Sequence, residues 1–338
     1  MRFQTFLSAI ALTALTATAA FADGELNLYS SRHYDTDERL YTDFEAQTGI
    51  TVNRIEAKAG ALMERMRAEG KNSPADILLT VDAGNLWRAT GAGLLQTIES
   101  KILDERIPEN LREPDGSWYA FSQRARMIFY AKDRVKNPPQ TYEALADPQY
   151  EGQVCARSSS NIYMQSLLAS IVAHSGVEAA TEWTQGLYDN LARKPQGGDT
   201  DQLRGLISGE CDIALANSYY FARGLRKPVK GLSDGIGGIG WIFPNQEDRG
   251  AHVNVSGGGV AAHAPNRENA IRFLEYLASD SAQAYFSAGN DEFPVVEGAE
   301  ISDEARSLGD FEADALNVSE LGAHQREAQM IYDRVGYP

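Results

Sequence analysis

The chain has 338 residues, with 47 aspartates and glutamates against 31 lysines and arginines, and a formal net charge of −16. Because so acidic a protein repels phosphate backbones and anionic lipid surfaces, nucleic acids and membranes are poor candidates as partners. Its length exceeds that of one typical domain, so two lobes are expected.

The first predicted element is a secretory signal peptide over residues 1–22. A single positive residue, Arg2, precedes an apolar stretch rich in Leu and Ala that ends in Ala20-Phe21-Ala22. This layout has a small-x-small cleavage site, so we expect cleavage after Ala22 and export of the protein. A membrane anchor is the alternative, but Thr and Ser interrupt the stretch and no basic stop-transfer flank follows it. After it no apolar run reaches the ~20 residues that span a bilayer, which argues against membrane insertion.

The next part of the chain alternates between strand and helix patterns. Strands are predicted at 26–29, 51–56 and 77–81, and helices from Leu40 to a stop at Gly49, over 62–69 and from Leu86 onward. Asp35 to Glu38 have the pattern of a capping box ahead of the first helix. Such alternation predicts an α/β fold with mostly parallel sheets flanked by helices.

A long alternating stretch, WYAFSQRARMIFYA at 118–131, is predicted to cross between the lobes as a strand. A second α/β run follows it. Its predicted strands are 152–157, 212–217 and 238–244, and its predicted helices are 161–174, 177–190 and 200–208. The segment 252–264 is predicted to cross back, and further helices are expected at 270–278, 281–286 and 319–334.

Two crossings between two α/β lobes imply a cleft and a hinge that closes on a ligand. We expect lobe 1 to comprise residues 23–121 plus about 247–290, and lobe 2 to comprise 122–246 plus about 300–338.

The chain has two cysteines, Cys155 and Cys211, and an exported chain meets an oxidising compartment. Each lies eight residues before a tyrosine, Tyr163 and Tyr219 respectively. If their segments are neighbouring parallel strands, the two sulfur atoms lie at similar depth. We therefore predict a disulfide that ties these strands together; two buried free thiols are the alternative.

Histidine and tyrosine side chains follow three of the predicted strands. They are His33, Tyr34, Tyr163, Tyr219 and Tyr220. Open α/β sheets bind ligands at the carboxyl ends of their strands, so these side chains are expected to share one cleft. A tyrosine titrates near pH ~10 and loses its proton only to a strong Lewis acid. A single tyrosine is more often a packing residue, but four in this placement favour a hard trivalent cation, ferric iron.

Three arginines could balance the charge of such a site. Four phenolates around Fe³⁺ leave about one net negative charge, which is costly to bury unpaired. Arg124 and Arg126 lie on the predicted crossing strand, and Arg223 follows Tyr220 by three residues. For each arginine the alternative is a solvated or carboxylate-paired surface position.

Several motifs resemble one family of transport proteins. They are LYSSRHYDTD, ADILLTVDAGNL, RARMIFYAKD, CARSSSNIYMQSL, ANSYYFARGL, NVSGGGVAAHAPNRENAIRFLEYLAS and DALNVSELGAHQREAQMIYDRVGYP. They are similar to those of the periplasmic ferric-iron-binding proteins that feed ABC importers, within the type II solute-binding fold. The resemblance covers nearly the whole chain after residue 22.

The resemblance implies a two-lobed, monomeric periplasmic receptor that binds Fe³⁺ and passes it to an inner-membrane ABC permease without catalysing a reaction. The implied ligands are Tyr34, Tyr163, Tyr219 and Tyr220, with His33 either a fifth ligand or a residue that lines the cleft. It also implies an arginine near the metal, corresponding to Arg124, Arg126 or Arg223.

Two other functions fit the same sequence. A type II receptor for a small organic anion would use the three arginines and helix N-termini, with the tyrosines as stacking groups. An exported hydrolase could use Ser158 to Ser160 as nucleophile, although these serines are better explained as caps of the following helix and no histidine is recognisable as their base.

Overall fold

The computed structural model describes residues 24–32 and 35–338. The predicted signal peptide, 1–22, and two of the predicted ligands, His33 and Tyr34, lie outside the described residues.

The strands of the described part are β1 (Gly24–Ser30), β2 (Ile50–Glu56), β3 (Ile77–Val81), β4 (Tyr119–Ala131), β5 (Val154–Cys155), β6 (Ile213–Asn217), β7 (Ile239–Ile242), β8 (Val253–Val260) and β9 (Phe293–Pro294). Its α-helices are α1 (Glu38–Thr48), α2 (Ala59–Glu69), α3 (Ala83–Gly91), α4 (Lys101–Arg106), α5 (Ile162–Asp189), α6 (Asp199–Ser208), α7 (Ser218–Arg226), α8 (Arg267–Leu277), α9 (Asp280–Asn290), α10 (Asp303–Arg306), α11 (Ser319–Ala323) and α12 (Gln325–Val335). Short 3₁₀ helices occur at Asp35–Asp37, Gly70–Asn72, Glu109–Leu111, Glu143–Ala146, Pro148–Tyr150 and Ile236–Gly238.

The strands form one mixed sheet in the order β2-β1-β3-β8-β4-β6-β5, and β7 and β9 also pair with β4. β1 is parallel to β2 and to β3, and β5 is parallel to β6, as strand–helix alternation predicts. β8 is antiparallel to both β3 and β4, and β4 is antiparallel to β6. Parallel pairing is thus confirmed inside each half of the sheet, whereas its middle is antiparallel because the crossing strands run against their neighbours.

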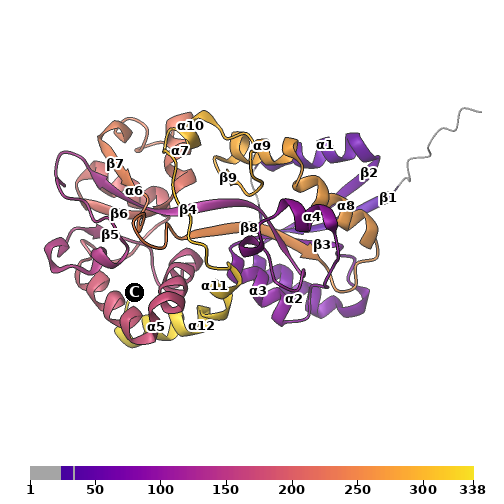
Figure 1. The fold of residues 1–338 in the computed structure, drawn as a ribbon, viewed down its shortest axis with the longest axis horizontal. Helices are drawn as coiled ribbons and strands as arrows, with labels where there is room; N and C mark the ends of the chain where they lie inside the picture. Colours follow the sequence, from indigo (N-terminus) through magenta and orange to yellow (C-terminus); the bar gives the residue numbers. More distant parts are fainter. Residues whose placement is uncertain (1–23, 33–34) are drawn as a thin grey trace, which may run out of the picture.

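The long strand β4 joins the two halves, as predicted for a crossing strand. Residues 119–125 of β4 pair with β8, and residues 126–131 pair with β6 and β7. Figure 1 shows β4 and β8 side by side through the middle of the molecule, with β1 and β2 at one end and β5 to β7 at the other. One apolar core centres on β1, β3 and β8, and a second lies between α5, α12 and the β5–β6 edge.

Glycines in β8 allow the crossing strands to approach their neighbours closely. A Cβ atom on Gly259 would lie 2.2 Å from the carbonyl oxygen of Ser117, and one on Gly257 would lie 2.5 Å from that of Tyr119. Contacts this short with backbone atoms cannot be relieved by a rotamer change, so only glycine fits at these two positions.

The tyrosine pair 219–220 lies in the first turn of α7, a helix without a counterpart among the predicted elements. Other predicted helices agree in place but differ in detail. α5 contains a break at Gly176 (φ +81°), so the two helices predicted there are confirmed as two segments. The predicted closing helix is two helices, α11 and α12, divided at His324. In the described part of the chain no helix is long and apolar enough to cross a membrane.

One predicted helix cap is wrong, and the other is not tested. The predicted capping box begins at Asp35, whose side chain lies outside the description; Asp37, the residue before α1, makes no side-chain capping bond, and its carboxylate accepts from the Arg32 guanidinium at 2.8 Å. The serines before α5 do not cap it either. Asn161 occupies the cap position without a side-chain bond, and the hydroxyls of Ser158 and Ser160 bond each other at 2.8 Å.

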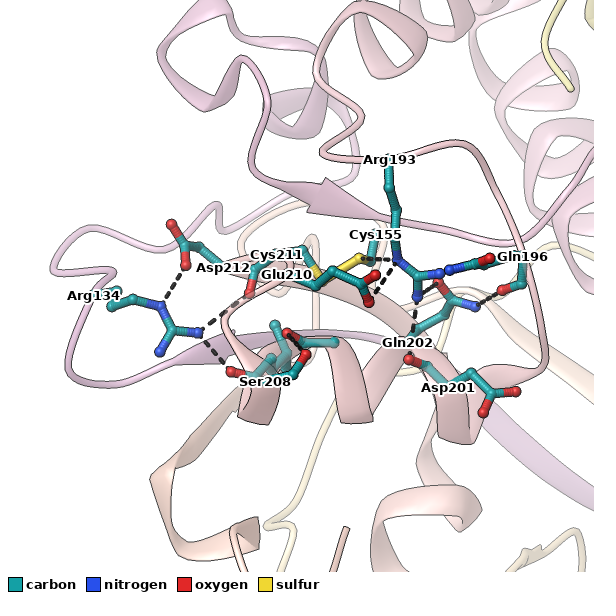
Figure 2. The surroundings of a disulfide bond; sticks show 12 residues. Arg134, Cys155, Arg193, Gln196, Asp201, Gln202, Ser208, Glu210, Cys211 and Asp212 are labelled. Carbon is teal, nitrogen blue, oxygen red and sulfur yellow. Dashed lines mark hydrogen bonds and ion pairs between the residues drawn. A yellow bond between two sulfur atoms is a disulfide. The ribbon is translucent and has the colours of Figure 1, made fainter. Parts of the chain in front are cut away.

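The predicted disulfide between Cys155 and Cys211 is confirmed. It joins the end of β5 to the turn that precedes β6, with the two Cα atoms 5.8 Å apart. Helix α6 packs directly over it, because a Cβ on Gly205 would lie 2.7 Å from the Cys211 sulfur. The Arg193 guanidinium also contacts the disulfide, with its Nε 3.2 Å from the Cys155 sulfur (Figure 2). The bond therefore ties together the two strands that lead to Tyr163 and Tyr219.

Candidate metal centre

Tyr163 lies in the first turn of α5, which follows β5. The helix begins at Ile162, so Tyr163 is its second residue, and its side chain is half-buried. The N-terminal end of a helix carries a partial positive charge, which favours an anionic phenolate over a neutral phenol.

Tyr219 and Tyr220 lie in the first turn of α7, which follows β6 without an intervening loop. Tyr219 is buried and Tyr220 is half-buried. Their ring centroids are 4.3 Å apart with planes inclined by 30°. Since neighbouring helical residues point in directions about 100° apart, both rings can lean toward the same end of the helix. The helical start explains how the rings of two adjacent tyrosines can pack against each other, which a regular strand would prevent.

The parallel pairing of β5 and β6 brings the starts of α5 and α7 to the same edge of the sheet. As a result the hydroxyl oxygens of Tyr163 and Tyr219 are 3.4 Å apart. A hard cation held octahedrally at about 2.0–2.1 Å places adjacent ligand oxygens roughly 2.9 Å apart. Two of the four predicted phenol oxygens, those of Tyr163 and Tyr219, therefore lie at a separation close to the one a metal requires, and the Tyr220 ring packs against that of Tyr219.

Arg124 on β4 is a buried cation beside these phenols. Its guanidinium carbon lies 5.7 Å from the Tyr163 ring centroid, and Nη1 donates to the Ser256 hydroxyl at 2.9 Å. Its Nε and Nη2 are buried and hydrogen-bond no described residue. Burial by itself disfavours the charge, yet the pKa of Arg124 is raised because phenol and carboxyl groups, Tyr163 and Glu292 foremost, face it. The guanidinium of Arg124 therefore carries a permanent positive charge next to the tyrosines.

Arg223 lies one turn after the tyrosine pair on α7. Its guanidinium carbon is 5.5 Å from the Tyr219 ring centroid and 5.9 Å from that of Tyr220. The carboxylate of Asp291 holds it from the other side, at 3.7 Å from Nε. Arg223 therefore also adds positive charge next to the phenols.

Arg126 has a different environment from Arg124, although both lie on β4. Its Nη1 is 2.6 Å from the Asp199 carboxylate and 3.0 Å from the Asn217 side-chain oxygen, and both Arg126 and Asp199 are buried. The charge of Arg126 is therefore matched by a carboxylate within the protein core.

Sequence reasoning missed two residues of this region. Arg157 lies with its guanidinium carbon 5.5 Å from the Tyr163 ring centroid, and Glu292 is a buried carboxylate that accepts from Ser122 at 2.6 Å and Arg32 at 3.1 Å. Arg157 follows Cys155, the last residue of β5, by two residues. The rule that ligand-binding residues gather at the carboxyl ends of strands could therefore have indicated it. Glu292 comes from a part of the chain with no strand or helix pattern.

Other metal-binding chemistry is not apparent in residues 24–32 and 35–338, where no group of three or more His, Cys, Asp or Glu side chains could hold a metal ion. His174 pairs with Asp314 at 2.7 Å, and His252 is a core residue. Burial, together with the charges of Arg126 and Arg124, lowers the pKa of His252 to about 3. Within the described residues the tyrosines are the strongest candidate ligands.

This fold, two α/β halves joined by crossing strands with a cluster of polar groups at strand ends, is the type II solute-binding architecture. Residues 39–313 match the family described as bacterial extracellular solute-binding protein, and the chain belongs to that family.

Several similar proteins have names that refer to iron. Iron uptake protein A2 of Synechocystis is 49% identical over 337 residues, which is 98% of this chain and 96% of the relative. A Trichodesmium protein named IdiA or FutA, solved in complex with iron and citrate, superposes with a TM-score of 0.90 at 50% identity, covering 93% of this chain and all of that one. The ferric binding protein of Campylobacter jejuni gives a TM-score of 0.87 at 39% identity, covering 93% of this chain and 100% of that one.

Proposed function

We propose that the protein is the periplasmic substrate-binding component of an iron(III) ABC importer. The observation that carries the proposal is that the phenol oxygens of Tyr163 and Tyr219, at two helix starts, lie 3.4 Å apart beside the buried Arg124. The likeness to iron-uptake and ferric-binding proteins over almost the whole chain supports it.

The proposed ligands include two residues outside the described part of the chain. The full set is Tyr34, Tyr163, Tyr219 and Tyr220, with His33 as a fifth donor. Four phenolates and Fe³⁺ leave one negative charge; Arg124, next to the Tyr163 ring, and Arg223, next to the Tyr219 ring, compensate it in this proposal. Arg126 is left out of this set, because its guanidinium bonds to Asp199 and Asn217, at 2.6 Å and 3.0 Å.

The transport role needs a cleft, export and a partner. In this proposal residues 23–121 with about 247–290 and residues 122–246 with about 300–338 form lobes that close on the metal. Residues 1–22 direct the chain to the periplasm, and the monomeric protein hands its iron to an inner-membrane permease. The protein makes and breaks no bond of a substrate, in keeping with relatives that are named for uptake and binding.

Visible absorption tests this function directly. Titration of purified protein with ferric citrate should produce a broad tyrosinate-to-iron charge-transfer band that saturates at one iron per chain. Tyr219→Phe/Tyr220→Phe should lose or shift the band, whereas Tyr188→Phe, an exposed tyrosine near the far end of α5, should leave it unchanged. A colourless wild-type protein, or a double variant with an unchanged band, contradicts the assignment.

A receptor for a small organic anion is the second candidate. It is favoured by the two buried donors of Arg124 that hydrogen-bond no described residue. Calorimetry with citrate alone separates the two, because the iron receptor should require ferric ion for tight binding. Equal affinity for citrate with and without iron would favour the anion receptor.

A further inference from the structure

Asp82 combines unusual features at the end of β3. Its backbone has φ +76° and ψ 124°, a conformation that non-glycine residues rarely adopt and that often marks functional positions. Its side chain is fully buried. A buried carboxylate is costly, so the structure must hold it with specific partners.

Those partners come from three separate segments. One carboxylate oxygen accepts from the backbone N–H of Gly84 at 2.9 Å, which caps α3. The other accepts from the Asn254 side chain on β8 at 2.9 Å. Both oxygens lie 2.9 Å from the hydroxyl of Ser166 on α5. The first two partners lie in the same half of the sheet as Asp82, but α5 packs on the other half.

Ser166 lies one helical turn after Tyr163 on α5, so its position determines that of the first turn. Nearby, α3 and the α11–α12 segment also approach closely. A Cβ on Gly84 would lie 2.5 Å from the Gln325 side chain, and one on Gly322 would lie 2.3 Å from Trp87. The Asp82–Ser166 hydrogen bond therefore lies at a close-packed junction between segments of the two proposed lobes.

We propose that the Asp82–Ser166 hydrogen bond is a closure latch: it forms when the lobes come together and holds the first turn of α5, with Tyr163, in place over the bound metal. Ser166 is thus a positioning residue that touches no metal. The inference rests on the proposed function and adds a residue that sets how long the cargo is retained.

Replacing one serine tests the latch, and the same helix provides a matched control. Ser166→Ala removes the bond to Asp82. Ser170→Ala removes an equally buried hydroxyl one turn further on, whose bond among the described residues is to the Leu167 carbonyl oxygen of the same helix, at 2.7 Å. Iron release to excess EDTA would be followed by the decay of the tyrosinate band, and the melting temperature of the iron-free protein would be measured in parallel.

Hydrogen bonds to charged groups are strong enough that loss of this one should speed iron release by about tenfold or more. Ser170→Ala should release iron at the wild-type rate, and Ser166→Thr, which keeps the hydroxyl, should restore slow release. Equal melting temperatures of the two iron-free alanine variants would separate the latch from a general loss of stability.

Two results overturn the proposal. If Ser166→Ala and Ser170→Ala release iron at the same rate while the wild-type protein shows the ferric band, the latch is wrong and the iron-binding function stands. A wild-type protein without that band removes the proposed function and the latch together. Should Ser166→Ala fail to fold, Ser166→Cys supplies the test, because a thiol is a weak donor and should still accelerate release.

Discussion

The buried pair between Arg126 and Asp199 makes a quantitative prediction about stability. In Asp199→Ala the guanidinium of Arg126 loses its partner at 2.6 Å, and the backbone N–H of Asn217 loses an acceptor at 2.8 Å. Because neither side chain reaches solvent, breaking such a pair costs about 3–5 kcal/mol of unfolding free energy. With a urea slope of roughly 3 kcal/mol/M, the unfolding midpoint should fall by about 1–1.7 M.

A surface pair provides the control. Asp43→Ala removes a partner of Arg39 at 3.2 Å on α1, where both side chains are largely exposed, and should cost less than about 1 kcal/mol. The double change Arg126→Met/Asp199→Leu should recover most of the lost stability, since apolar side chains replace a buried pair at little cost. Equal urea midpoints for Asp199→Ala and Asp43→Ala would refute the reasoning. Loss of the ferric band in the stable double variant would show that Arg126 does balance the metal.

Two further predictions concern stability. Cys155→Ser/Cys211→Ser should lower the unfolding free energy by about 4 kcal/mol in urea titrations, because the bond closes a loop with a sequence separation of 56 residues; a loss under about 1 kcal/mol would contradict this. Burial is the main cause that lowers the pKa of His252 to about 3, below the ~6.5 of a histidine in an unfolded chain. Between these two pH values the unfolded state binds a proton that the folded state does not. Stability should therefore fall as pH drops from ~6.5 toward 3. His252→Gln should flatten that part of the stability profile, and an unchanged slope would show that other groups cause it.

Much of the fold followed from local patterns. Each strand predicted from the alternation of strand and helix signals has a counterpart in the structure. The uninterrupted apolar alternation of 118–131 indicated the crossing strand β4. The matched spacing of Cys155 and Cys211 from Tyr163 and Tyr219 indicated the disulfide, because parallel neighbouring strands keep their register along the sheet. The same rule, that ligands gather at strand ends, selected the tyrosines.

The arginines show what the sequence could not decide. Arg124 and Arg126 are two residues apart on one strand and so lie on the same face of the sheet. The alternation of side chains along a strand therefore cannot distinguish their environments. Only packing separates them, since Asp199, distant in the chain, neutralises Arg126 and leaves Arg124 facing the phenols.

The sequence by itself indicated most of the order of strands and helices, the disulfide and the tyrosines proposed as ligands, because these depend on periodicity and on position along the chain. Tertiary structure decided which charges face the tyrosines, and that Asp82 meets Ser166 across 84 residues of sequence. Such contacts depend on distances between segments that no local pattern records.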